Sequence, residues 1–266
     1  MAKSLRPPHF EATSEITPGP PSTDGVGAAP AIENEPLTAQ DLRDAWAVIS
    51  VQERLDGFAQ LDRASADDFF LSLPARDQSS LLLALPNSNR RSWLRLLPPD
   101  DAVDVIQALD EEHRAAMLQF LDGPTRQEVQ ALLAYAQDAA GGLMSPRFAR
   151  LRPDVSVEEA VRYLRRQARE HLEMIYYAYI LDQEQRLRGV VSFRDLFTAP
   201  GERPVSEIMN LDVVSVPDTL DQEAVAKVMA RYDLNAVPVV DAEGRMKGIV
   251  TIDDIVDVVQ REATED

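Results

Sequence analysis

The chain has 266 residues, of which 45% are hydrophobic and 27% charged, so it is long enough to form about two domains with sizeable cores. It has no cysteine and only three histidines, far apart in sequence, which excludes disulfides, thiolate metal sites and cysteine nucleophiles and argues against a zinc cluster. The net charge of −18 disfavours nucleic acid as a partner, and no apolar run approaches the roughly 18–20 residues of a membrane span. We expect a soluble, cytoplasmic protein.

Residues 1–36 are rich in Pro, Gly, Ser and Thr, as in "TPGPPSTDGVGAAP", and show no sustained hydrophobic periodicity. A segment of this composition buries too little apolar surface to offset the entropy of ordering it. It is predicted to be a disordered tail.

Residues 37–140 contain a short repeat. From Leu61 onward, leucine recurs every 12 residues, at positions 61, 73, 85, 97, 109 and 121, and a second apolar residue follows eight positions later. Units open with Pro or Asp, which favour the first turn of a helix, and prolines at 74, 86, 98 and 124 exclude one long helix, since an interior proline costs about 3 kcal/mol. The pattern predicts an all-helical superhelix of short stacked helices.

The stretch "AYAQDAAGGLMSP" (134–146) joins this region to the rest of the chain. Gly141 and Gly142 are predicted to end the helical run, and Pro146 is predicted to prevent its resumption.

The second half of the chain repeats itself. The passage "RPDVSVEEAV … YILDQEQRLRGVVSFRDLF" returns as "VPDTLDQEAV … VVDAEGRMKGIVTIDDIV", which predicts two copies, at 141–200 and 201–266. Each copy is predicted to contain an extended segment, a helix, two strands and a closing helix, with Asp253 or Asp254 capping the last helix. Their net charges differ, +2 for the first and −9 for the second.

This unit, with "AVPVVD" and "GIVTIDDIVD", resembles a CBS domain, and two in tandem resemble a Bateman module. The order of leucine repeat, "AGGLM" junction and CBS pair ending in "REATED" resembles the cytosolic region of the MgtE-type magnesium transporters over about residues 40–266. The implied fold class is multidomain α and α/β, a helical superhelix followed by a tandem CBS module. The family continues into a transmembrane pore, whereas this sequence stops at Asp266. It is expected to be either the regulatory half of a transporter or a shortened relative.

Carboxylates are the candidate metal ligands, because Mg²⁺ is held by one or two carboxylates plus waters. In the closing helix, carboxylates spaced by three and four residues share a face. For any one Asp in a first helical turn, capping and helix-dipole compensation is the competing interpretation. The resemblance implies that regulatory Mg²⁺ lies between the helical and CBS domains and around the CBS pair, at Asp68, Asp100, Asp104, Asp221, Glu223, Asp233, Asp254, Asp257, Glu262, Glu265 and Asp266.

The expected function is magnesium sensing. Two acidic domains repel one another until a divalent cation bridges their facing carboxylates. In the family, the bridged state closes the attached pore. The resemblance also implies a homodimer through the CBS pair and, when a pore is attached, a position at the cytoplasmic face of the inner membrane. The alternative is a free-standing CBS-pair sensor that binds adenine nucleotide and does not transport.

A nucleotide motif occurs in both copies. CBS sites for adenosine use a "G-h-h-[ST]-x-x-D" stretch, present as Gly189, Ser192 and Asp195 in the first copy and as Gly248, Thr251 and Asp254 in the second. The competing interpretation is that the hydroxyl residues cap the following helices. ATP is expected at the first copy, since surplus carboxylates in the second would repel its phosphates. No glycine-rich phosphate loop, nucleophile elbow or histidine triad is present, so we do not expect an enzyme.

Overall fold

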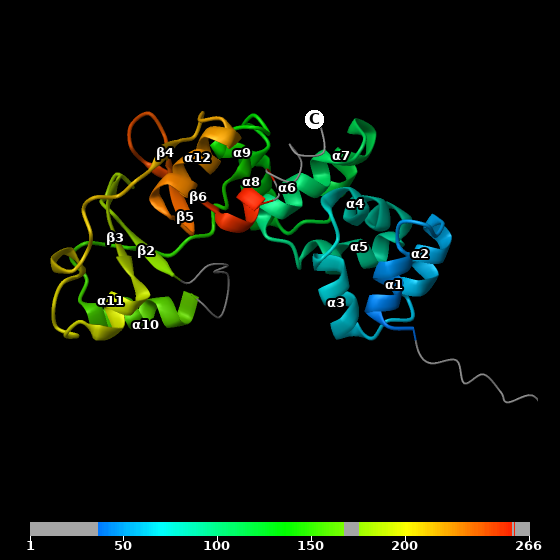
Figure 1. Cartoon of the computed structure of the whole chain (residues 1–266), viewed down its shortest axis with the longest axis horizontal. Helices are drawn as coiled ribbons and strands as arrows, with labels where there is room; N and C mark the ends of the chain where they lie inside the picture. The colour runs from blue at the N-terminus through cyan, green and yellow to red at the C-terminus, as the bar shows by residue number, and fades with distance from the viewer. Residues whose placement is uncertain (1–36, 168–175, 257, 259–266) are drawn as a thin grey trace, which may run out of the picture. The chain divides into compact units, whose positions relative to one another are not determined.

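The computed structural model describes residues 37–167, 176–256 and 258. Within these ranges, short helices come first and two copies of a strand, helix, strand, strand and helix unit follow (Figure 1). The predicted tail at 1–36 lies outside the described residues. No helix in the described ranges combines the length and the apolar character that crossing a bilayer requires.

The helices of the first region start at twelve-residue intervals. They are α1 (Ala39–Ala45), α2 (Val51–Phe58), α3 (Arg63–Leu71), α4 (Ala75–Ala84), α5 (Asn87–Leu94), α6 (Pro99–Gln107), α7 (Glu111–Leu118) and α8 (Gly123–Leu132). The predicted period is therefore confirmed, and it begins two units earlier than Leu61. Leu37 and Ile49 hold the leucine position in these earlier units.

The residue before each helix explains why the helix starts there. Thr38 and Ser50 form capping boxes with acids three residues later, and the Asp62 carboxylate accepts from the amides of the next turn. Pro74, Pro86 and Pro98 precede α4, α5 and α6, where the ring favours the extended entry to a helix.

The core of this region is built from the periodic apolar positions. The residues eight after each leucine are all buried, namely Phe69, Leu81, Trp93, Val105, Met117 and Val129. At its N-terminal end, the Phe58 ring centroid lies 4.8 Å from that of Trp93, and the Trp46 centroid lies 5.1 Å from that of Phe69. Each buried side chain of this size contributes roughly 1.5–3 kcal/mol through removal from water.

The fourth residue of several helices is a second periodic position, and its side chain links that helix to the end of the preceding one. The fourth residue of a helix often sends its side chain back to carbonyl groups at the end of the preceding helix, which have no partner within that helix. The Arg90 guanidinium donates to Leu83 O at 2.6 Å and to Leu85 O at 3.0 Å. The same position in other repeats is held by Arg54, Gln78, Arg114 and Arg126, which donate in the same way.

The junction corrects the prediction for its glycines. The helical run ends at Leu132, and Gly141 and Gly142 lie inside a separate short helix, α9 (Ala140–Leu143). A Cβ on Gly141 would lie 2.3 Å from the Tyr135 ring, and one on Gly142 would lie 2.3 Å from Ala136 O. These glycines permit close packing against the preceding turn rather than terminating a helix.

Each CBS copy forms a three-stranded sheet. The first contains β1 (Arg150–Leu151), α10 (Val157–Gln167), β2 (Tyr177–Leu181), β3 (Leu187–Ser192) and α11 (Phe193–Thr198). After the short 3-10 helix η1 (Val205–Glu207), the second contains β4 (Val216–Pro217), α12 (Gln222–Tyr232), β5 (Ala236–Val240) and β6 (Met246–Thr251). The orders are β1-β2-β3 and β4-β5-β6, with the first pair parallel and the second antiparallel in each.

The predicted pattern of elements in the two copies is confirmed, with one correction at the closing helix. That helix begins at Ile252, directly after Thr251, so neither Asp253 nor Asp254 is its cap residue. Asp254 is instead its third residue.

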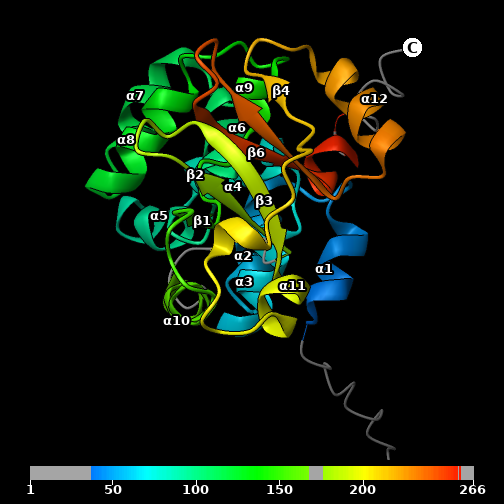
Figure 2. The ribbon, with the colours of Figure 1, turned by 90° about the vertical axis from the view of Figure 1, so that its left-hand side faces the viewer.

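The two sheets share a small apolar layer. Phe148, Tyr179 and Leu181 from the first copy pack against Met246 and Ile249 of the second. The opposite face of the first sheet is covered by α10 and α11, as Figures 1 and 2 show.

The segment that leads into each copy pairs with the sheet of the other copy. Ser145 and Ile249 exchange backbone hydrogen bonds of 2.8 and 2.9 Å, and Val190 and Asn210 exchange bonds of the same lengths. The junction is also tied to the second copy by the bond from the Ala140 amide to Leu220 O at 2.7 Å. The two copies are therefore interlocked by their own connecting segments.

Candidate divalent cation site

The first carboxylates of the candidate site stand at the start of α6. Asp100 and Asp104 are half-buried and lie four residues apart, so they share one face of the helix. Pro98 precedes the helix and makes no side-chain capping bond. Carboxylates in the first turn are stabilised by the positive end of the helix dipole.

A further carboxylate, that of Asp254, lies in the first turn of the helix that follows β6. The Thr251 amide donates to Asp254 Oδ2 at 2.8 Å, and the Thr251 hydroxyl donates to the same oxygen at 2.6 Å. Burial is the largest cause that raises the pKa of Asp254 to about 8. The Thr251 bonds oppose this shift, whereas the negative charges of Asp100 and Asp253 add to it.

Both helices contribute to one apolar cluster. Val103 and Ile106 of α6 belong to the same buried core as Ile255 and Val258 of the closing helix. The charge of Asp100 acts on Asp254, although the two residues lie in different domains of the sequence. The arrangement brings two acids together in partly buried surroundings, where a cation is favoured over a second negative charge.

Three further predicted ligands have structural partners around α12. Asp221 caps the helix, and its Oδ1 accepts from the amides of Glu223 and Ala224 at 2.9 and 3.3 Å. Glu223 accepts from Lys227 Nζ at 2.9 Å. Asp233 ends the helix in the left-handed conformation, with φ of 53°. These features are the ones expected if the acids only cap and stabilise the helix. Other oxygens of the Asp221 and Glu223 carboxylates are not used in these bonds.

Of the remaining predicted ligands, Asp68 is exposed on α3, and Asp257, Glu262, Glu265 and Asp266 lie outside the described residues. Among the residues that the structure describes, no group of three or more His, Asp or Glu side chains is arranged to hold a metal ion. One pair of predicted ligands from the two domains, Asp100 and Asp254, interacts through charge.

The nucleotide motif has the same bond between hydroxyl and carboxylate in both copies. The Ser192 hydroxyl donates to Asp195 Oδ2 at 2.6 Å and accepts from the Asp195 amide at 3.0 Å, so Ser192 caps α11. Thr251 and Asp254 repeat the hydroxyl-to-carboxylate bond. The residues of the motif are therefore in place in both copies, held by local helix capping.

The motif glycines allow another segment to cross the sheet. A Cβ on Gly189 would lie 2.8 Å from Met209 Sδ, and one on Gly248 would lie 2.6 Å from Ser145 O. Each glycine is therefore required where the crossing segment packs on the strand.

Family models match nearly all of the described chain. The model of the MgtE intracellular N domain matches residues 37–138, and the CBS domain model matches residues 140–202 and 205–261. The crystal structure of the cytosolic domain of the Mg²⁺ channel MgtE in complex with ATP aligns with a TM-score of 0.77 and 42% identity, covering 83% of this chain and 90% of that one. This chain belongs to the MgtE family.

Two other relatives agree with this assignment. The crystal structure of the soluble part of a magnesium transporter aligns with a TM-score of 0.61 and 31% identity, covering 85% of this chain and 93% of that one. The magnesium transporter MgtE of Thermus thermophilus is 53% identical over 146 residues, which are 55% of this chain and 32% of that relative. These MgtE-family relatives are transporter proteins rather than enzymes.

The MgtE-family chain described here covers only part of such transporters. The matched regions span 32%, 30% and 33% of the length of three curated magnesium transporters.

None of the predicted site residues lines a hollow in the first CBS copy. This hollow lies along β1 and α10, and four of its lining residues are arginines. The signal that could have located it is the charge difference between the copies, +2 against −9.

Proposed function

We propose that this chain is the magnesium-sensing regulatory region of a magnesium transporter or channel. The observation that carries the proposal is the electrostatic interaction between Asp100 and Asp254: burial is the largest cause that raises the pKa of Asp254 to about 8, and the negative charge of Asp100 adds to it. A divalent cation between them reverses this effect and stabilises the contact between α6 and the closing helix.

Mg²⁺ suits such a pair because it retains several waters and takes few protein ligands. Asp104, four residues after Asp100 on the same helix, is a further expected ligand of the hydrated ion. Asp257, which the sequence places three residues after Asp254, is the further ligand expected from the closing helix. A small set of carboxylates with water in the remaining positions meets the coordination preference of Mg²⁺.

The proposal extends to an attached pore. The relatives that this chain matches are whole transporters of about three times the matched length, which supports a membrane domain joined to the CBS pair at the cytoplasmic face. Magnesium closes the pore by drawing the helical domain onto the second CBS copy. When magnesium is lost, the two domains separate and the pore opens.

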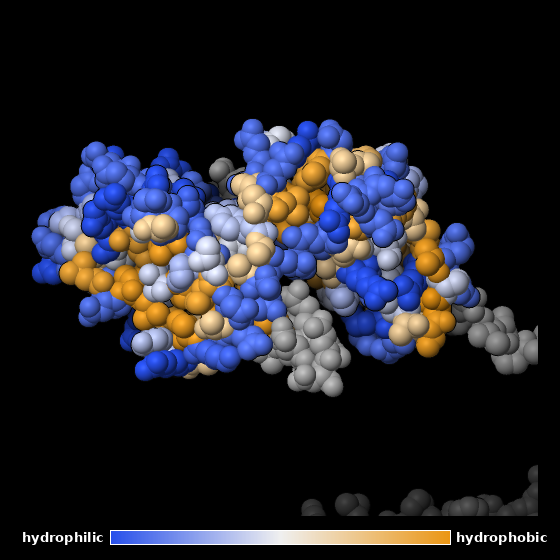
Figure 3. Space-filling view, turned by 90° about the horizontal axis from the view of Figure 1, so that it is seen from above, coloured by the Kyte–Doolittle hydropathy of each residue, from blue (hydrophilic) through white to orange (hydrophobic). Residues whose placement is uncertain are grey.

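A homodimer through the CBS pair is part of the same proposal. Phe197 on α11 and Tyr232 on α12 are large apolar residues with exposed fractions of 60% and 51%. Figure 3 shows one face of the molecule, on which apolar patches interrupt a hydrophilic surface. Such exposed side chains on the CBS helices support an interface between two copies.

Small-angle scattering with magnesium tests the sensing proposal. Magnesium in the millimolar range is expected to compact the chain relative to chelator, and Asp100→Asn or Asp254→Asn is expected to abolish the change. Asp110→Asn is the matched control, because Asp110 is an exposed helix cap that makes no side-chain capping bond. Identical profiles in chelator and in excess magnesium would refute the proposal.

We also propose ATP as a modulator at the first CBS copy. The support is the Ser192 and Asp195 pair at the end of β3, together with the relative that was crystallised with ATP. Isothermal titration is expected to give heat with ATP for the native chain and for Asp212→Asn, an exposed control, but not for Asp195→Asn. Equal heats for both variants would place ATP elsewhere.

A further inference from the structure

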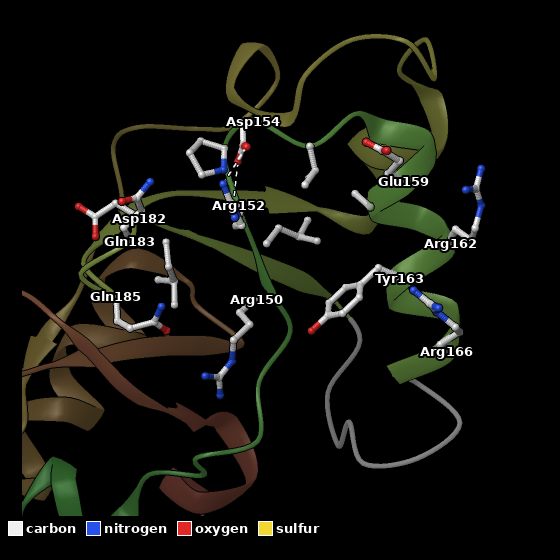
Figure 4. A pocket seen from close by; sticks show the side chains of 15 residues that line it. Arg150, Arg152, Asp154, Glu159, Arg162, Tyr163, Arg166, Asp182, Gln183 and Gln185 are labelled. Carbon is white, nitrogen blue, oxygen red and sulfur yellow. Dashed lines mark hydrogen bonds and ion pairs between the residues drawn. The ribbon is translucent and has the colours of Figure 1, made fainter.

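A hollow of about 1140 Å³ runs along the outer edge of the first CBS sheet. Its walls are β1 and the residues after it, one side of α10, and the turn between β2 and β3 (Figure 4). The volume is slightly above the roughly 300–1,000 Å³ of typical small-molecule sites, so the hollow can hold a small molecule. The hollow lies apart from Ser192 and Asp195, which do not line it.

Each acidic residue of this hollow already has hydrogen-bond partners, and arginines neutralise two of the three, Asp154 and Asp182. Asp154 accepts two bonds from the Arg152 guanidinium, at 2.9 and 3.0 Å. Asp182 accepts from Arg188 Nε at 2.7 Å and from backbone amides of the turn. Glu159 closes the capping box of α10 with the amide and hydroxyl of Ser156.

Two arginines of the hollow lack such neutralisation. Within the described part of the chain, neither Arg150 nor Arg166 forms an ion pair with a carboxylate. The Arg150 guanidinium stacks on the Phe148 ring, 4.6 Å from its centroid, which leaves the N–H groups at its edge available. Figure 4 shows the Tyr163 hydroxyl directed from α10 toward the β1 side, with Arg166 beside it on the same helix.

We propose that this hollow binds a phosphorylated small molecule of nucleotide size. Arg150 and Arg166 would hold the phosphates, since guanidinium groups match phosphate oxygens in geometry and charge. The half-buried Tyr163 supplies a hydroxyl donor and an aromatic face between the two arginines. The net positive charge of the first copy, in a chain of net charge −18, favours an anion here.

The hollow lies next to a second hollow that the helical domain also lines. Arg150 and Tyr163 also line a neighbouring hollow of about 510 Å³, together with Asp122 and Glu128 from the region of α8. Arg147 bonds Glu128 there at 2.9 Å. A ligand on Arg150 therefore contacts the place where α8 meets the first CBS copy. None of the proposed magnesium ligands lines this hollow, so a test of phosphate binding does not depend on the magnesium proposal.

Isothermal titration of the full chain, in chelator and low salt, tests the proposal with pyrophosphate and with ADP as probes. One-to-one binding that weakens with salt is expected. Arg150→Gln and Arg166→Gln are expected to weaken it by about tenfold each, the loss of one charge-assisted contact. Arg165→Gln is the matched control, because Arg165 is an exposed neighbour on α10 that does not line the hollow. Thermal melting without ligand checks that the variants fold.

The probes also separate what the site recognises. Equal affinities for pyrophosphate and ADP would support recognition of phosphates alone, and tighter binding of ADP that is lost in Tyr163→Leu would support recognition of the base as well. Absence of binding by both probes, equal loss in Arg165→Gln, or loss of pyrophosphate binding in Ser192→Ala would overturn the proposal. The last result would assign the phosphate to the motif at the end of β3.

Discussion

The carboxylate of Asp100, in the first turn of α6, acts through its charge on Asp254, in the first turn of the helix after β6. Burial is the largest cause that raises the pKa of Asp254 to about 8, and the charge of Asp100 adds to this shift. The two residues are 154 positions apart, yet their helices contribute to one buried apolar cluster. We expect this coupling to make the contact between the N domain and the second CBS copy sensitive to a proton or a cation that neutralises Asp254.

Stability in chelator is expected to fall as the pH rises from about 4 to about 8. The folded pKa of Asp254, about 8, lies above the ordinary aspartate value of about 3.9, so the folded state binds a proton in this window that the unfolded state has released. The stabilisation is complete below pH of about 4 and is lost as the pH passes through about 8.

Urea denaturation across this pH range measures the effect. Asp254→Asn is expected to remove most of the slope, whereas Asp253→Asn, at an exposed neighbour, retains most of it. Asp241 does not contribute to the pH dependence of stability in this range. Burial acts to raise the pKa of Asp241, but bonds from Arg245 and Lys247 lower it to about 2, so its contribution changes only in more acidic solution. Equal slopes in the native chain and Asp254→Asn would contradict this prediction.

Magnesium affinity is expected to increase with pH. A cation that binds the Asp254 carboxylate must displace its proton, so affinity rises by about tenfold per pH unit until the pH reaches about 8. Titration calorimetry in buffers of different ionisation enthalpy should detect the released proton. An affinity that does not change between pH of about 6 and 8 would show that Asp254 is not a ligand.

Arg90→Ala is expected to destabilise the helical domain by about 2–3 kcal/mol, because two partly buried carbonyl groups at the end of the preceding helix lose a charged donor. Arg91→Ala is the matched control. Arg91 is the next residue on α5 and is exposed, so its removal should change the free energy of unfolding by less than about 0.5 kcal/mol. Equal effects in the two variants would show that the carbonyl bonds do not stabilise the repeat.

The helical repeat was predictable because leucine recurs every 12 residues, the same interval as the helix starts. Its first two units were missed because Ala45 and Gly57 occupy the position where later units place large residues such as Phe69. The arginine caps could not be predicted, since their acceptors are carbonyl groups whose exposure depends on how successive helices turn. The helix at Gly141 and Gly142 was missed because local propensity disfavours it, and only the packing of Tyr135 and Ala136 explains it.

The candidate site was predictable only as a set of acids. Resemblance placed Asp100 and Asp254 in that set, and the structure adds that the charge of Asp100 acts on Asp254. Sequence could not separate acids used as caps from acids free to bind, because capping depends on whether a side chain turns back onto its own helix. The hollow beside Tyr163 requires the packing of α10 along β1, which no local pattern encodes.

Gly248→Ala is expected to cost about 3 kcal/mol, because the added Cβ would lie 2.6 Å from Ser145 O and 2.8 Å from Met144 Cγ. The new methyl group would separate the junction from β6, where Ser145 and Ile249 pair. Gly123→Ala is the control, since a Cβ there meets nothing within 4 Å. Thermal unfolding compares the two variants. A Gly248→Ala protein as stable as Gly123→Ala would mean that the crossing segment is not held against the strand.

Two substitutions at Asp221 separate its two proposed roles. Its Oδ1 caps α12, so Asp221→Ala should lower the free energy of unfolding by about 1 kcal/mol even in chelator. Serine caps a helix about as well as aspartate but carries no negative charge, so Asp221→Ser should keep the stability in chelator near that of the native chain. If Asp221 is a magnesium ligand, Asp221→Ser nevertheless loses part of the stabilisation that magnesium gives, and thermal melting with and without magnesium measures that loss. A full magnesium response in Asp221→Ser would restrict Asp221 to capping, because the serine hydroxyl reproduces the cap and not the charge.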